Sequence, residues 1–287
     1  MRIVVASGKG GTGKTTVATS LALAAGEPVR FLDCDVEAPN AALFLDPAID
    51  RRQDVGIFKP VVDEAYCTYC GECAEVCEFH AIAVIGKKIM VFPELCHGCG
   101  SCTLICPEKA IDERLDVMGV LEGGATAGGI DFECGVMNVG EPMAVPIIRE
   151  LKKWHGSPAL QTQDDVVEIR DAPPGASCPV VETIRGADFV LLVTEPTPFG
   201  LHDLKQVVGI VRELAIPTGV VVNRDGIGDD ATDAYCAEAG IPILLRIPMD
   251  RRIAEAIAGG KPLVAAAPEY RARFRALLDG ITARVAA

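Results

Sequence analysis

The chain has 287 residues, which is enough for one large domain or for a domain that carries an insert, and 49% of the residues are hydrophobic. The net charge of −13 argues against attraction to nucleic acid or to an anionic membrane through overall charge. No apolar run reaches the length that crosses a bilayer, and the first predicted strand starts by Ile3. We therefore expect no signal peptide and a cytoplasmic protein. The chain has twelve cysteines, and in a reducing cytoplasm the close spacing of many of them indicates metal ligands rather than disulfides.

A glycine-rich loop at residues 8–16 is the first motif in the chain. It follows an apolar run at 3–7 that predicts a buried strand, and it opens into a helix predicted over 17–25. In this context the G-x-x-x-x-G-K-T pattern predicts a phosphate site, in which Lys14 neutralises the β- and γ-phosphates and Thr15 holds Mg²⁺. The predicted phosphate-binding residues are Gly8, Gly10, Gly11, Thr12, Gly13, Lys14, Thr15 and Thr16.

Lys9, directly before Gly10 and Gly11, distinguishes this loop from a plain P-loop. The loop resembles the deviant Walker A motif of the MinD/ParA/Mrp family, which are SIMIBI-type P-loop ATPases. The resemblance implies ATP or ADP with Mg²⁺ as cofactors, and an ATP-dependent homodimer or a heterodimer with a related ATPase. It also implies that Lys9 and Lys14 are catalytic, with Lys9 reaching the partner's nucleotide. The alternative is a solvated lysine that only raises the local potential.

Acidic residues follow two of the predicted strands. The strand at 29–32 leads into Asp33 and Asp35, and the strand at 166–170 leads into Asp171 and then a Pro-Pro-Gly turn ending at Gly175. Carboxylates at strand ends face the crevice where an α/β sheet binds its ligand, although capping aspartates in a turn are the alternative. The resemblance implies that Asp35 positions the attacking water, that Asp33 and Asp171 are linked to Mg²⁺, and that the Gly175 N–H senses the γ-phosphate.

Two later strand ends are assigned to the nucleotide base. Predicted strands at 220–222 and 243–247 run into Asn223 and Arg224, and into Pro248 and Asp250. By the resemblance, Asn223 contacts adenine and the backbone at 248–250 lines the other side of the base. Alternation of strands and helices along the chain predicts an α/β fold with a mostly parallel sheet, and in a P-loop NTPase of this family the helices cover both faces.

A cysteine-rich segment interrupts this α/β pattern. Two C-x₂-C-x₂-C-x₃-C runs follow each other at an offset of 29 residues, and they contain Cys67, Cys70, Cys73 and Cys77, then Cys96, Cys99, Cys102 and Cys106. Thiolates three residues apart in a tight loop can hold three corners of a cubane, and the fourth ligand must then come from elsewhere. A pair of zinc sites is the alternative, although zinc usually takes separated pairs of ligands.

This segment resembles a bacterial-type ferredoxin with two [4Fe–4S] clusters, a small α+β domain. In that arrangement the fourth cysteine of each run ligates the other cluster. The resemblance implies a first cluster held by Cys67, Cys70, Cys73 and Cys106, and a second held by Cys77, Cys96, Cys99 and Cys102. The predicted domains are an ATPase at 1–58 and 115–287, and a ferredoxin insert at 59–114. Residues 60–113 contain nine acidic residues and three lysines, so the insert should meet a basic partner.

Three further features lie outside these sites. The glycine-rich stretch at 123–129, between strands predicted at 117–121 and 130–136, predicts a mobile hairpin tip or loop. The helix predicted at 269–285 has an apolar face, which we expect to pack on the sheet, with membrane binding as the alternative. Cys178 lies seven residues after Asp171, a position that resembles the cluster cysteine of one family member, but we expect it to be a buried free cysteine.

We therefore predict a MinD-like protein that binds and hydrolyses ATP and carries two [4Fe–4S] clusters. Nucleotide-dependent dimerisation would be coupled to electron transfer, or to presentation of the clusters to a redox or cluster-accepting protein. One alternative is an iron–sulfur cluster assembly or carrier ATPase. The other is a non-redox positioning ATPase whose clusters are structural. We expect neither nucleic acid nor a membrane as a partner.

Overall fold

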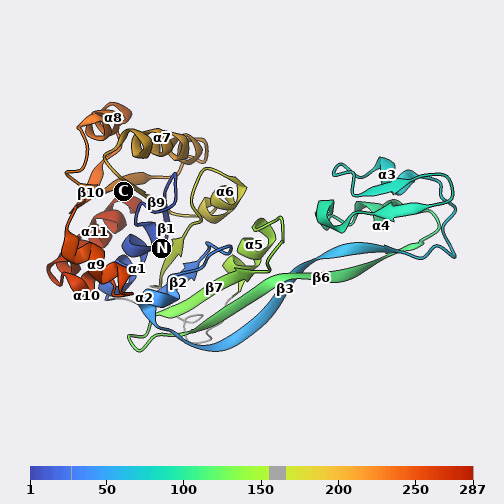
Figure 1. The fold of residues 1–287 in the computed structure, drawn as a ribbon, viewed down its shortest axis with the longest axis horizontal. Helices are drawn as coiled ribbons and strands as arrows, with labels where there is room; N and C mark the ends of the chain where they lie inside the picture. The colour runs from blue at the N-terminus through green and yellow to red at the C-terminus, as the bar shows by residue number, and fades with distance from the viewer. Residues whose placement is uncertain (27, 155–165, 287) are drawn as a thin grey trace.

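The computed structural model describes residues 1–26, 28–154 and 166–286. Figure 1 shows a body built around a twisted sheet and a small lobe at the end of a long two-stranded ribbon. Both termini lie in the body (Figure 1). The ribbon is made of β3 (Ala48–Val62) and β6 (Ile111–Ala125), so the lobe is formed by the chain between them.

The described residues form a nine-stranded sheet in the order β11-β10-β9-β1-β8-β2-β7-β6-β3. The strands from β11 to β7 pair in parallel, whereas β6 and β3 add to the edge in antiparallel fashion. The mostly parallel α/β sheet expected from the sequence is confirmed. Besides β3 and β6, the strands are β1 (Arg2–Ala6), β2 (Val29–Asp33), β7 (Asp131–Met137), β8 (Val167–Asp171), β9 (Phe189–Thr194), β10 (Thr218–Asp225) and β11 (Ile243–Pro248).

Helices cover both faces of this sheet. Alternate residues of a strand point to opposite faces, and both sets are apolar in the central strands, so each face packs against helices. Ile3 and Val5 of β1 pack in one apolar cluster with Phe274 of α11. Val4 and Ala6 pack in a second cluster on the other face, with α6 and α7. The helices of the body are α1 (Lys14–Ala24), α2 (Ala42–Leu45), α5 (Val145–Lys153), α6 (Cys178–Ile184), α7 (Pro198–Glu213), α8 (Ala231–Ala239), α9 (Arg251–Ala258), α10 (Leu263–Ala266) and α11 (Glu269–Val285).

The C-terminal helix α11 has the bounds that its pattern predicts, and its apolar face packs into the body. Tyr270, Phe274, Leu277, Leu278 and Ile281 are buried. Val285, at the end of the predicted face, is instead 36% exposed. The packed helix therefore corresponds to the expected arrangement over all but its last turn.

The glycines at 123–129 do not form the single loop that was predicted. Gly123 and Gly124 belong to β6, and only the turn at 126–130 joins β6 to β7, with the Thr126 N–H donating to the Ile130 carbonyl. A Cβ atom on Gly124 would lie 1.9 Å from the carbonyl oxygen of Ala48 on the neighbouring strand. Glycine at this position thus permits close approach of two strands.

The lobe contains two short helices and a hairpin. Its elements are α3 (Glu72–Glu75), β4 (Ile82–Val84), β5 (Ile89–Val91), the 3₁₀ turn η1 (Pro93–Leu95) and α4 (Ser101–Ile105). Its small core is formed by Cys73, Ile82, Ile89 and Ile111. Both ribbon strands continue unbroken through the predicted domain boundaries at 58/59 and 114/115, so the lobe is attached through a paired β-ladder rather than an irregular linker.

Candidate nucleotide and cysteine sites

The phosphate loop connects the end of β1 to the start of α1. Gly11 and Gly13 have φ angles of 80° and 89°, a region that favours glycine. A Cβ atom on Gly13 would also lie 2.3 Å from the Nδ2 of Asn223. The chain can therefore turn directly into α1, whose first residues line a cavity of ≈450 Å³. The positive end of the helix dipole thus lies at this cavity, as an anion site requires.

A buried ion pair lies below the loop. The Lys14 Nζ is 2.6 Å from Asp171 Oδ1, and the Thr15 hydroxyl donates to Asp171 Oδ2 at 2.6 Å. The side chains of Lys14 and Asp171 are 7% and 0% exposed. Burial alone would lower the pKa of Lys14, but the charge of Asp171 and its hydrogen bond outweigh this effect and raise that pKa. The predicted phosphate lysine is therefore held charged beside the carboxylate predicted to be linked to Mg²⁺.

The loop after β2 wraps around Asp33. The backbone N–H groups of Asn40 and Ala41 donate to Asp33 Oδ2 at 2.9 Å each, and the N–H of Asp35 donates to Oδ1 at 3.2 Å. Complete burial, together with the nearby charge of Asp171, raises the pKa of Asp33 to about 7. Asp35 lines the cavity, and burial raises its pKa as well. The three carboxylates predicted from the sequence therefore gather around Lys14.

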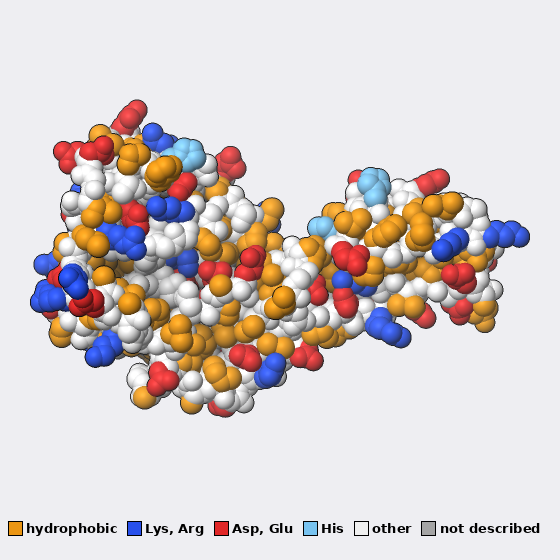
Figure 2. Space-filling view, viewed as in Figure 1, with side chains coloured by type: hydrophobic (Ala, Val, Ile, Leu, Met, Phe, Trp, Pro, Cys, Tyr) orange, Lys and Arg blue, Asp and Glu red, His pale blue; other side chains and the backbone are white. Residues whose placement is uncertain are grey.

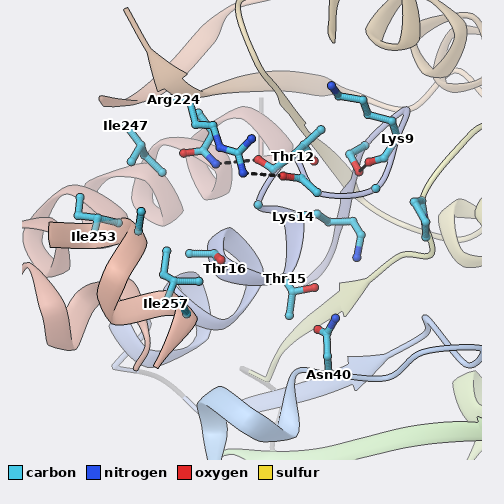
Figure 3. A pocket seen from close by; sticks show the side chains of 18 of the residues that line it. Lys9, Thr12, Lys14, Thr15, Thr16, Asn40, Arg224, Ile247, Ile253 and Ile257 are labelled. Carbon is cyan, nitrogen blue, oxygen red and sulfur yellow. Dashed lines mark hydrogen bonds between the residues drawn. The ribbon is translucent and has the colours of Figure 1, made fainter. Parts of the chain in front are cut away.

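The opposite side of the loop is tied to β9 and β10. The Asn223 amide donates to the Thr12 carbonyl at 2.7 Å, and Arg224 donates to the Gly11 carbonyl at 3.1 Å (Figure 3). Glu195 accepts from Arg224 at 2.6 Å and from Lys9 at 3.3 Å. Glu195 was not predicted, although its place directly after β9, next to β1, is at the same strand-end crevice. In this structure Glu195 therefore holds Lys9 within its own chain.

An apolar wall closes the cavity where the base was expected. Figure 3 shows Ile247, Ile253 and Ile257 on the side opposite Lys9. The lining also includes the predicted residues Pro248 and Asp250. Sequence reasoning missed the isoleucines of α9, because at helical spacing they are indistinguishable from core residues.

Gly175 differs from its expected environment. Its N–H, predicted to sense a γ-phosphate, donates to the Ser7 carbonyl at 3.0 Å, and Gly175 has a φ of 100°. Its neighbour Pro174 lines the cavity. A role in sensing therefore requires this amide to leave Ser7 and reorient.

Two cavities in the lobe separate the eight clustered cysteines into two sets. One cavity is lined by Cys67, Cys70, Cys73 and Cys106. The other is lined by Cys77, Cys96, Cys99 and Cys102. Within the described ranges, no group of three or more His, Cys, Asp or Glu side chains is arranged to hold a single metal ion. Each set thus surrounds a space instead of converging on one point.

The two cysteine runs have matching backbone geometry. Backbone N–H groups of Ala81 and Ala110 donate to the sulfurs of Cys77 and Cys106, both at 3.3 Å. Positive φ angles also recur at the offset of 29 residues, in the pairs Tyr69 and Gly98, Gly71 and Gly100, and His80 and Lys109. Such N–H···S bonds favour thiolates over thiols, which is what cluster ligation needs.

The cysteines outside the lobe differ in exposure. Cys34, Cys134 and Cys236 are buried, and burial raises the pKa of the Cys34 and Cys134 thiols to about 12. Cys178 is exposed, so the expectation that it is buried is wrong. It begins the short helix α6 after the Pro-Pro-Gly turn.

Residues 3–263 match the model of the CobQ/CobB/MinD/ParA nucleotide binding domain family. The chain belongs to this family. An uncharacterized protein of Methanocaldococcus jannaschii is 33% identical over 265 residues, which cover 91% of this chain and 90% of that protein. An iron-sulfur cluster carrier protein of the same organism is 24% identical over 99% of this chain and 84% of its own.

Solved structures of this family share the fold. The septum site-determining protein MinD of Pyrococcus horikoshii, complexed with Mg-ADP, has a TM-score of 0.57 and 20% identity, and the match covers 98% of this chain and 95% of that one. The predicted MinD/ParA-type P-loop fold is thus confirmed. In the part of the chain that the structure describes, no helix is long and apolar enough to cross a bilayer.

Proposed function

We propose that this MinD/ParA-type protein hydrolyses ATP and carries two [4Fe–4S] clusters in its lobe. The ATPase domain would comprise residues 1–58 and 115–287, and the ferredoxin insert residues 59–114. The observation that carries the proposal is the separation of eight cysteines into two cavities, each lined by one of the two expected ligand sets. Four thiols that line a cavity fit a cubane, which occupies volume, better than a zinc ion, which needs ligands converging on a point.

The nucleotide site supports hydrolysis of ATP by water to ADP and phosphate. Lys14 would exchange Asp171 for the β- and γ-phosphates, which leaves Thr15, Asp33 and Asp171 around Mg²⁺. Asp35 lines the same cavity and would orient the attacking water. Lys9 would leave Glu195 for the nucleotide of a partner chain, so ATP would favour a dimer with a second copy or with a related ATPase.

The surface of the lobe supports a role in meeting a redox partner. Figure 2 shows hydrophobic side chains gathered on it among scattered acidic and basic groups. Its exposed apolar residues include Phe79, Phe92, Leu95 and Leu104, which is 90% exposed. Each cluster would accept one electron from a low-potential donor protein and pass one electron to an acceptor protein with a basic rim. ATP hydrolysis would time this transfer through the dimer.

A cluster carrier is the second candidate, because iron-sulfur cluster carrier proteins are among the full-length relatives. Such a carrier must release its cluster readily. The chain has no C-x-x-C pair outside the lobe to bridge a transferable cluster between subunits. Each expected ligand set in the lobe instead combines three cysteines of one run with one cysteine of the other, an arrangement that favours retention of the clusters.

Anaerobic kinetics would separate these functions. The protein would be reduced by dithionite and mixed with a one-electron acceptor such as cytochrome c, in the presence of ATP or ADP. We expect electron transfer at a rate that depends on ATP in the wild type and is insensitive to ATP in Lys14→Ala. Iron delivery to an apo-ferredoxin without electron transfer would favour the carrier. If neither process responds to ATP, the clusters are structural and the proposal fails.

A further inference from the structure

The two cysteine cavities lie at different distances from the body. The cavity with Cys96 is also lined by Phe58, Pro60 and Glu113, and we call it the near site. The cavity with Cys67 is lined by Val62, Ala110 and Ile111 at the outer end of the ribbon, and we call it the far site. β3 runs outward from the body, so its residue 58 is closer to the body than its residue 62 (Figure 1).

Gly98 forms a tight joint between the near site and the ribbon. A Cβ atom on Gly98 would lie 2.9 Å from the Cβ of Ile57 and 3.0 Å from the Phe58 carbonyl oxygen. The Gly98 N–H also donates to the sulfur of Cys96 at 3.4 Å. One residue thus contacts both a β3 side chain and a near-site thiol. At the equivalent position of the far site stands Tyr69, whose hydroxyl donates to Glu64 within the lobe.

Ile57 also contacts the body on the side where α5 packs. It packs against an apolar cluster that contains Val36, Val55 of β3 and Met118 of β6. Val36 follows Asp35 directly, is 1% exposed, and accepts a hydrogen bond from the Met137 N–H at 2.9 Å. The Asp35 loop is therefore packed against the same cluster as Ile57, without an irregular linker in between.

We infer that Ile57 is a positioning residue that couples the Asp35 loop to the near cysteine site, so that the bound nucleotide changes the near site and leaves the far site unchanged. This inference rests on the proposed function, because it requires the Asp35 loop to move when a γ-phosphate binds. Movement of Val36 shifts the packed cluster, and Ile57 transmits that shift to Gly98 and the Cys96 thiolate. Among the described residues, the lining of the far site comes from the lobe and the ribbon end and includes none from the body. Packed side chains with two arrangements can carry coupling of this kind, but only a measured coupling establishes it.

Hydrogen–deuterium exchange tests this inference without relying on activity. The anaerobic protein as purified would be saturated with ADP or with a non-hydrolysable ATP analogue. We expect the exchange rate of the segment 96–102 to differ at least about threefold between the two nucleotides, and that of 67–73 to stay the same. In Ile57→Ala the difference at 96–102 should be lost, and Ile57→Val should largely restore it.

Ile49→Ala is the matched control, because it makes the same change in the same strand at a side chain that is 46% exposed. It should behave as the wild type. Equal responses of both segments, no response of either in nucleotide-saturated protein, or an unchanged difference in Ile57→Ala would each overturn the inference. The iron content of the same samples tests the proposed function separately, since iron-loaded protein with unresponsive segments would refute only the coupling.

Discussion

Replacing Lys14 with alanine tests the electrostatics of the nucleotide site before any nucleotide is added. The change leaves Asp171 and Asp33, both 0% exposed, without the lysine that lies 2.6 Å from Asp171. Removing one partner of a buried ion pair typically costs about 3–5 kcal/mol of folding free energy, because the remaining charge is buried without compensation. With a urea dependence of about 3 kcal/mol/M, the unfolding midpoint should fall by roughly 1–1.7 M.

Fluorescence of Trp154, the single tryptophan, reports this unfolding, because the residue packs beside the apolar cluster under α5. The double variant Lys14→Ala/Asp171→Asn should recover much of the loss, since it also removes the uncompensated carboxylate and leaves Thr15 an acceptor. A midpoint unchanged by Lys14→Ala would show that the pair contributes nothing. Additive losses in the double variant would show that the two residues do not interact.

Three further predictions concern single residues. Asp35→Ala should bind ATP with near wild-type affinity but release phosphate at least about 100-fold more slowly, because the water loses its orienting carboxylate, and a wild-type rate would remove Asp35 from the mechanism. In denaturant titrations, Gly13→Ala should lower the free energy of unfolding by about 1–3 kcal/mol, because the φ of Gly13 is 89° and the new Cβ meets Asn223. Gly10→Ala is the control, because its new Cβ would meet no atom within 4 Å, and it should change the free energy of unfolding by less than about 0.5 kcal/mol. Burial raises the pKa of Glu168, but Arg170 and Arg30 outweigh burial and lower that pKa, so its contribution to stability is present above about pH 4.3 and is lost as the pH falls through the lowered value. Glu168→Gln should therefore cost about 1.5–3 kcal/mol at pH 7 and progressively less in acid, and a cost independent of pH would contradict this account.

The sequence predicts the strands of the parallel sheet, because most of them are short runs rich in apolar residues with a recognisable turn at the end, whereas the helices α2, α6, α8, α9 and α10 were not predicted. Asp33 and Asp171 end two parallel strands, and Lys14 begins the helix that follows β1, so the three residues lie together at one edge of the sheet. The ribbon strand β3 was not predicted. Most of its residues are exposed, and only a few near Val55 pack under α5, so its burial does not alternate in the way that marks a strand in a core.

The contacts across the site could not be predicted from local pattern. Glu195 holds Lys9 and Arg224 because β9 lies beside β1, a neighbour relation that only the folded sheet defines. The joint between Gly98 and Ile57 likewise depends on how the lobe folds back on the ribbon. A glycine between two cysteines has the same appearance in sequence whether it contacts solvent or a strand.

The most direct test of the central claim is the metal content of the anaerobically purified protein, measured together with acid-labile sulfide. Two cubanes predict about eight irons and eight sulfides per chain, with little zinc. Cys96→Ser and Cys67→Ser should each weaken one site, and the exposed Cys178→Ser should leave the content unchanged. About two zinc ions per chain, with iron and sulfide near zero, would contradict the account.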